Sequence, residues 1–130
     1  MMKRVLLVDD DKICNFIAES TLNRLGVAKE VHSALNGQEA LDLFNGYFQG
    51  DVAVPDIIFL DLNMPIMDGF QFIDAFKKLD FPKKENILIV ILTSSMNPQD
   101  IQQAKSLGID HYMAKPINEE KIMTLLKDFN

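Results

Sequence analysis

Acidic residues directly follow two short apolar runs in this chain, and their placement indicates metal chemistry. Asp9 and Asp10 come after the apolar residues 5–8, and Asp61 comes after the apolar residues 57–60. Runs of this kind are typical of buried strands, and open α/β sheets bind ligands at the carboxyl ends of their strands. Carboxylates gathered in one place repel one another unless a cation or a proton offsets their charge. We therefore expect an acidic metal site with one carboxylate available for chemistry.

Two further strand ends supply a hydroxyl and an ammonium group. Thr93 follows the apolar run at residues 87–92, and Lys115 follows a short strand-like segment at 110–114. A carboxylate can attack phosphorus and form an aspartyl phosphate, while a lysine offsets charge on the transferring phosphoryl group. Mg²⁺ prefers oxygen ligands and keeps several waters, so one or two carboxylates suffice. Asp10 and Asp61 are the candidate ligands, with Asp9 acting directly or through water.

Alternating strand-like and helix-like segments must position these residues. Strands are expected at 5–8, 27–33, 57–60, 87–92 and 110–114. The segment after the first strand has apolar or small residues at helical spacing, namely Cys14, Ile17, Ala18, Thr21, Leu22 and Leu25. Gly26 is its expected C-cap, and Asn97 and Pro98 are expected to begin the fourth helix. Five such βα units with right-handed crossovers predict one doubly wound α/β domain over residues 1–130.

The bulk composition excludes several classes of protein. The 130 residues carry a net charge of −6, which argues against a nucleic-acid partner because such partners need a basic surface. The single cysteine, Cys14, excludes an internal disulfide and suits a reducing, cytoplasmic setting. The longest apolar run, residues 87–92, is far shorter than the roughly 18 residues of a membrane span. We expect a soluble signalling or binding domain without a membrane partner.

These motifs resemble the receiver domain of two-component response regulators over nearly the whole chain. The matching residues are Val8-Asp9-Asp10, Asp61, Asn63-Met64-Pro65, Met67-Asp68-Gly69, Thr93-Ser94 and Lys115-Pro116. The stretch from Asn63 to Gly69 is especially similar to single-domain chemotaxis regulators. The resemblance implies a flavodoxin-like (βα)5 sandwich with a five-stranded parallel sheet in the order 2-1-3-4-5. It also implies a stand-alone receiver with no output domain, which is not an enzyme beyond its own phosphorylation and dephosphorylation.

The resemblance further implies a role for each matching residue. Asp61 would be the phospho-acceptor, assisted by Lys115 and Thr93, and the Lys115-Pro116 bond would be cis. The Mg²⁺ ligand set would be Asp9, Asp10, Asp61 and the backbone carbonyl of Asn63. Thr93 and Tyr112 would form the switch pair, with the tyrosine turning inward on phosphorylation. Asn63 and Ser95 flank the expected path of water attack and are expected to tune the lifetime of the phosphorylated state.

Two apolar residues lie outside the expected core face of the first helix. Ile13 and Phe16 face away from Cys14 and Ile17 at helical spacing. Scattered apolar surface residues are common, but these two lie beside the acidic residues. We expect them to dock the helical bundle of a histidine kinase or histidine phosphotransferase. The output would be contact with an unknown downstream protein or onward phosphotransfer, and the receiver itself is expected to be a monomer.

Three other functions remain open from the sequence. A haloacid-dehalogenase-type phosphohydrolase also uses an aspartate, Mg²⁺, a threonine and a lysine, but places its nucleophile in an Asp-x-Asp pattern after the first strand. A nucleotide-binding module needs a glycine-rich phosphate loop, and none follows Val8. A pseudo-receiver would be a pure docking protein, although it usually lacks part of the acidic set.

Overall fold

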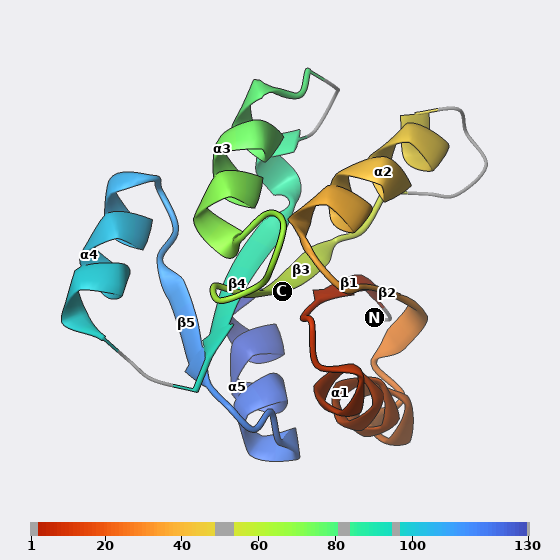
Figure 1. Cartoon of the computed structure of the whole chain (residues 1–130). Coiled ribbons are helices and arrows are strands. Elements are labelled where there is room, and N and C mark those ends of the chain that lie inside the picture. Colours follow the sequence, from red (N-terminus) through yellow and green to blue (C-terminus); the bar gives the residue numbers. More distant parts are fainter. Residues whose placement is uncertain (1–2, 49–53, 81–83, 95–96, 130) are drawn as a thin grey trace.

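The computed structural model describes residues 3–48, 54–80, 84–94 and 97–129, which form alternating strands and helices (Figure 1). The strands are β1 (Lys3–Val8), β2 (Ala28–Ala34), β3 (Ile57–Asp61), β4 (Leu88–Thr93) and β5 (His111–Ala114). The helices are α1 (Lys12–Leu25), α2 (Gly37–Phe48), α3 (Gly69–Lys78), α4 (Pro98–Ser106), α5 (Glu119–Phe129) and a short 3-10 helix, η1 (Lys84–Asn86). The five expected strands are present, with ends shifted by one or two residues.

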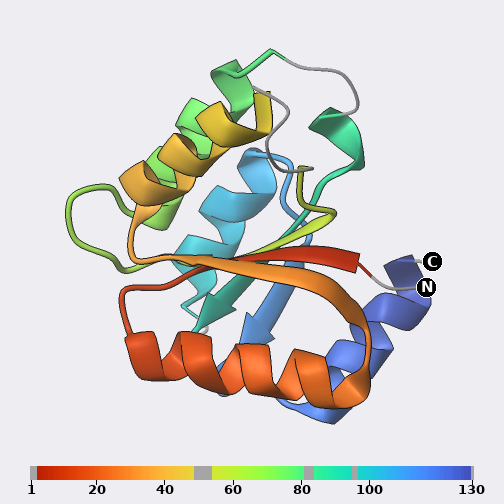
Figure 2. The ribbon, with the colours of Figure 1, turned by 90° about the vertical axis from the view of Figure 1, so that its right-hand side faces the viewer.

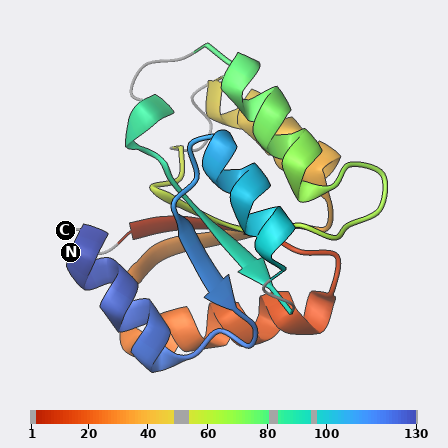
Figure 3. The same cartoon turned by 90° about the vertical axis from the view of Figure 1, so that its left-hand side faces the viewer.

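The five strands form one parallel sheet in the order β2-β1-β3-β4-β5. Helices α1 and α5 cover one face of this sheet, and α2, α3 and α4 cover the other (Figures 2 and 3). This arrangement confirms the doubly wound, flavodoxin-like fold. It also places the carboxyl ends of the neighbouring strands β1 and β3 side by side, where the chain order reverses and ligands bind in such sheets.

Side chains of the inner strands alternate between two separate cores. Leu6 and Val8 of β1 pack with α2, α3 and α4, whereas Val5 and Leu7 pack with α1 and α5. The same period of two runs through β3 and β4, which are buried on both faces as the sequence predicts. Because these strand interiors hold only apolar side chains, polar reactive groups are confined to the strand ends.

The buried face of α1 differs from the predicted one. Ile17 is 45% exposed and Cys14 is only half-buried, whereas Asn15 lies inside. The buried residues of the helix are Asn15, Ala18, Thr21 and Leu22. Ala18, Thr21 and Leu22 of the predicted stripe are buried, but Asn15 takes the inner position expected for Cys14 and Ile17. The Asn15 Nδ2 donates a hydrogen bond to the backbone carbonyl of Asp9 (2.9 Å), so this buried amide has a partner at the end of β1.

The end of α1 and the start of α4 have the predicted capping residues. Asp11 is the N-cap of α1 and accepts from the backbone N–H of Ile13 (2.9 Å). Gly26 ends that helix with φ of 68°, a left-handed conformation that glycine adopts without a Cβ clash. Asn97 caps α4, and Pro98 is its first residue. The Asp11 cap begins α1 directly after the acidic residues Asp9 and Asp10.

Candidate functional site

Four segments far apart in the sequence meet at the carboxyl edge of the sheet. Asp9 follows β1, Asp61 ends β3, Thr93 ends β4, and Lys115 follows β5. The backbone N–H of Lys115 donates to the carbonyl of Thr93 (2.8 Å), which extends the pairing of β4 and β5 to the site. Parallel pairing therefore brings together the strand-end residues that the sequence singled out.

Lys115 joins two carboxylates of this edge. Its Nζ lies 2.6 Å from Asp9 Oδ2 and 3.6 Å from Asp61 Oδ2. All three side chains are largely buried, and that of Asp61 is only 7% exposed. Burial disfavours the ammonium form, but the hydrogen bond to Asp9 and the charge of Asp61 outweigh it and raise the pKa of Lys115. The lysine is therefore a fixed positive charge beside Asp61.

Three carboxylates are close enough to share one cation. Asp9, Asp10 and Asp61 each offer an oxygen, and these oxygens lie within 4.8 Å of one another. Asp10 is exposed, whereas the other two are buried. Burial, reinforced by the negative charge of Asp9, raises the pKa of Asp61 to about 6, although Lys115 opposes the shift. One ammonium does not offset three carboxylates, so the site retains excess negative charge suited to a hard divalent cation.

Three hydrogen bonds hold the chain at Asp9. Its backbone N–H donates to the Ala34 carbonyl (3.0 Å). Asp9 Oδ1 accepts from the backbone N–H of Asp11 (3.0 Å), and the Asp9 carbonyl accepts from buried Asn15 (2.9 Å). The sequence analysis missed Asn15 because it considered only residue types that act in catalysis or bind metals. A signal was present, since Asn15 precedes Ala18 and Leu22 by three and seven residues and so lies on their helical face.

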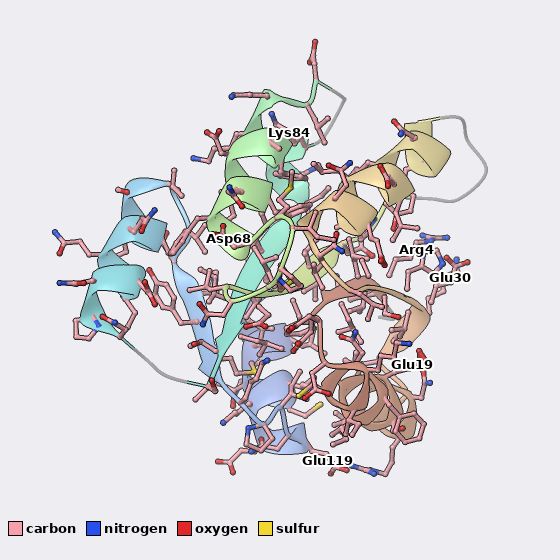
Figure 4. All side chains as sticks on the ribbon, in the orientation of Figure 1. Arg4, Glu19, Glu30, Asp68, Lys84 and Glu119 are labelled. Carbon is pink, nitrogen blue, oxygen red and sulfur yellow. The ribbon has the colours of Figure 1, made fainter. Side chains whose placement is uncertain are left out.

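The loop from β3 to α3 folds back tightly on the end of β3. A Cβ on Gly69 would lie 2.7 Å from the Asp61 carbonyl oxygen, so only glycine fits there without displacement of the backbone. Asp68, labelled in Figure 4, lies at the start of α3 and forms a reciprocal capping box with Gln71. Within the loop, the backbone N–H of Asn63 donates to Asp61 Oδ1 at 3.4 Å, and the Asn63 side chain is exposed. The loop therefore sets the position of the Asp61 carboxylate.

Thr93 and Tyr112 line one small cavity between β4, β5 and α4. Thr93 is buried, and Tyr112 is half-buried. The tyrosine hydroxyl donates to the carbonyl of Ile109 (2.8 Å). Leu62 and Ile101 also line the cavity. The cavity connects the strand end next to Asp61 with the surface of α4.

Comparison with known protein families identifies this arrangement. A family model described as the response regulator receiver domain matches residues 5–127. The chain belongs to this receiver family. Receivers are signalling domains of two-component phosphorelays, and this chain is a phosphorelay response regulator of that type.

Individual receivers of known sequence or structure are similar over almost the entire chain. Sporulation initiation phosphotransferase F of Bacillus subtilis is 30% identical over 129 residues, covering 99% of this chain and 94% of that protein. The crystal structure of a two-component response regulator from Cytophaga hutchinsonii is 31% identical with a TM-score of 0.86, covering 97% and 95% of the two chains. The Vibrio cholerae chemotaxis protein CheY4 is 30% identical with a TM-score of 0.78 and full coverage of both chains.

The apolar residues expected to dock a partner are exposed on the receiver. Ile13 and Phe16 of α1 are 69% and 71% exposed, and the helix begins beside the acidic cluster. Ile17, which the sequence places in the core, adds to this apolar surface with its own exposure. Exposure alone names no partner, so docking at these residues stays a prediction.

The remaining expectations have mixed outcomes. The Lys115-Pro116 bond is cis, as the resemblance implies. Ser95 lies outside the described residues, so its expected role has no structural description. No helix in the described part of the chain combines the length and the apolar character needed to cross a bilayer. Membership of the receiver family disfavours the phosphohydrolase and nucleotide-binding alternatives.

Proposed function

We propose that Asp61 of this receiver accepts a phosphoryl group from a phosphohistidine on a histidine kinase or histidine phosphotransferase. The observation that carries the proposal is the position of Lys115, whose ammonium lies 3.6 Å from Asp61 Oδ2 in a nearly buried pocket. A fixed positive charge at this distance stabilises the negative charge that develops on the phosphoryl oxygens. The name of the similar Bacillus subtilis phosphotransferase agrees with a place in a phosphorelay.

The donor set fits Mg²⁺. Asp9, Asp10 and Asp61 offer hard oxygen ligands within 4.8 Å of one another, and the backbone carbonyl of Asn63 is the proposed fourth protein ligand. When bound, Mg²⁺ would neutralise phosphoryl oxygens beside the acceptor. The chain's own contribution is to fix Asp9 through Asn15 and Lys115, and to hold Asp61 through the loop that Gly69 closes.

The transfer step conserves atoms and charge. An Asp61 carboxylate oxygen attacks phosphorus, and the new P–O bond forms as the P–N bond to the donor imidazole breaks. The electron pair of the broken bond stays on that ring nitrogen. When the other ring nitrogen carries a proton, the leaving group is neutral imidazole, so no further acid is required. Lys115 remains protonated throughout, which its raised pKa favours.

We further propose that Thr93 and Tyr112 report phosphorylation. The Thr93 hydroxyl would move toward the new phosphoryl oxygens, and Tyr112 would turn further into the cavity that both residues line. Phosphorylation would shift an equilibrium between two conformations and change the surface of α4, β5 and α5. The output is contact with a downstream protein or onward phosphotransfer, and we propose a cytoplasmic monomer without a nucleic-acid partner.

Small phosphodonors and analogues test the acceptor directly. The protein is incubated with Mg²⁺ and either acetyl phosphate or beryllium fluoride, and wild type is compared with Asp61→Asn. We expect an Mg²⁺-dependent covalent adduct from acetyl phosphate on wild type only, detected by intact mass and peptide mapping, and reversible beryllium fluoride binding to wild type only, detected by fluorine NMR. Equal adduct on the Asn variant would contradict the assignment, and absence of any adduct would favour a pseudo-receiver. Steady turnover of varied phosphate esters would favour a phosphohydrolase.

A further inference from the structure

Ile66, at the tip of the loop between β3 and α3, has an unusual backbone. Its φ is 68°, in the left-handed region that β-branched residues rarely adopt. The Met67 N–H donates to the Pro65 carbonyl across it (2.7 Å), the hydrogen bond of a strained γ-turn. Its side chain is nevertheless 81% exposed. Among the described residues, the other positive φ angles belong to Gly26 and Gly108, for which they carry no such penalty.

The loop that carries Ile66 is held on both sides. The Gly37 N–H donates to the Met67 carbonyl (3.1 Å), and a Cβ on Gly37 would lie 2.7 Å from Met67 Cγ. On the other side, the Gly69 N–H donates to the Leu62 carbonyl (3.0 Å). The γ-turn is thus built between two close backbone contacts. Ile66 is therefore presented outward from a fixed position.

Folding alone gives no reason for isoleucine at this position. Asparagine or glycine would adopt this φ at lower cost, and an apolar side chain in water gains no burial energy. A strained and exposed apolar residue therefore indicates a surface that becomes buried in a complex.

The position of Ile66 near the acceptor indicates which kind of partner would bury it. It follows Asp61 by five residues and leads toward α3 on one face of the sheet, whereas Ile13 and Phe16 belong to α1 on the other face. The loop and the start of α1 project from the same end of the molecule (Figure 2). Because the Asp61 side chain is only 7% exposed, a phosphohistidine can reach it only if the donor protein covers this end.

We propose that Ile66 is a second docking anchor for the phosphohistidine-bearing protein, across the acceptor from Ile13 and Phe16. This inference rests on the proposed function. The exposed charges beside the acceptor are those of Asp10, Asp11 and Lys12, with an excess of negative charge, and the chain has a net charge of −6. The complementary donor surface is apolar around its histidine, with a neutral or basic rim.

Two substitutions at position 66 separate docking from loop structure. Ile66→Asn removes the apolar group and suits the left-handed φ, and Ile66→Leu keeps an apolar group without β-branching. The protein donor is the autophosphorylated histidine kinase that labels wild type fastest in a panel of purified kinases, and the small donor is acetyl phosphate. For Ile66→Asn we expect kinase transfer to fall on the order of tenfold, unchanged labelling by acetyl phosphate and an equal or higher Tm. Ile66→Leu should keep kinase transfer within about twofold of wild type.

Each other outcome overturns the inference in a recognisable way. Unchanged kinase transfer to Ile66→Asn removes the docking role, and equal loss with acetyl phosphate makes the loop part of the phosphorylation pocket. Dimerisation of wild type that Ile66→Asn abolishes would assign the residue to a second copy of this chain. Kinase labelling of wild type that Ile66→Asn leaves unchanged overturns the docking inference alone, whereas labelling of wild type by acetyl phosphate but by no kinase overturns the proposed phosphohistidine donor as well.

Discussion

The acidic pocket and the apolar surface around it differ in whether their side chains already have partners within the chain. In the pocket, Asp9 and Asp61 are buried, and each is paired with the largely buried Lys115. The surface around the pocket, called the rim below, includes the large apolar side chains of Ile13, Phe16 and Ile66, which face solvent. The pocket is therefore organised before a partner binds, whereas the apolar side chains of the rim contribute free energy only when a partner protein buries them. This contrast indicates that chemistry and partner choice reside on different residues, which mutations can separate.

Removal of Lys115 should have the largest effect and should not distinguish between phosphodonors. Lys115→Ala leaves Asp9 and Asp61 without their ammonium partner and removes the charge that stabilises the transferring group. We expect labelling of Asp61 to slow by about a hundredfold, equally for acetyl phosphate and for a kinase donor. Time courses of labelling give both rates, and Lys115→Arg is the matched charge-keeping control. Loss with only one donor would break the division between pocket and rim.

Disruption of the α1 surface should have the converse effect. The double substitution Ile13→Asp/Phe16→Ser places a charge and a hydroxyl where a partner would bury apolar groups. We expect phosphotransfer from a histidine kinase to slow by roughly ten- to thirtyfold, with acetyl phosphate labelling unchanged. Lys29→Ala, an exposed position on β2, is the surface control. Equal loss with both donors, or no loss with either, would contradict a docking role.

The electrostatic cost of the pocket should appear in stability. Burial raises the pKa of Asp61 from 3.8 to about 6, so the folded protein binds this proton more tightly than the unfolded chain. Its contribution to stability is fully present below pH 3.8 and is lost as pH rises through 6. Asp61→Asn does not titrate, so we expect it to be more stable than wild type by about 1–2 kcal/mol above pH 6 without Mg²⁺.

Urea unfolding of wild type and Asp61→Asn across pH measures this difference. The advantage of the variant should grow between the two pKa values and then level off. Added Mg²⁺ should narrow it, because the cation stabilises the ionised wild-type pocket. A stability difference that does not change with pH would contradict a raised pKa of Asp61 in the folded protein.

The smallest expected effect concerns the residue that links the two regions. Asn15 belongs to α1, the helix of the rim, but its side chain holds the backbone of Asp9. Asn15→Ala should reduce stability by about 1 kcal/mol and weaken Mg²⁺ binding a few-fold, with acetyl phosphate and kinase labelling affected alike. Calorimetric titration with Mg²⁺ and thermal unfolding measure both. A loss of labelling with the kinase donor alone would show that Asn15 acts in partner docking and not in support of the pocket.

Most of the fold and the pocket could be predicted because they depend on local patterns and one topological rule. Apolar runs at residues 5–8, 57–60 and 87–92 predict strands buried on both faces. Parallel pairing then brings their polar ends together, so Asp9, Asp61 and Lys115 need no further information to meet. The buried face of α1 was predicted less well, since the polar residue Asn15 is buried with a hydrogen bond to Asp9 while the apolar Ile17 faces solvent.

The amino-acid sequence by itself determined the order of elements, the doubly buried strands and the set of reactive groups at the carboxyl edge. These follow from side-chain periodicity and from residues directly adjacent to strand ends. Only the tertiary structure decided that Lys115 lies closer to Asp9 than to Asp61, that Asn15 supports the pocket, and that Ile66 adopts a strained turn. Such features depend on ångström-scale distances and backbone angles, which residue types and their spacing do not give. The position of Lys115 in particular arises only when segments far apart in the chain pack together.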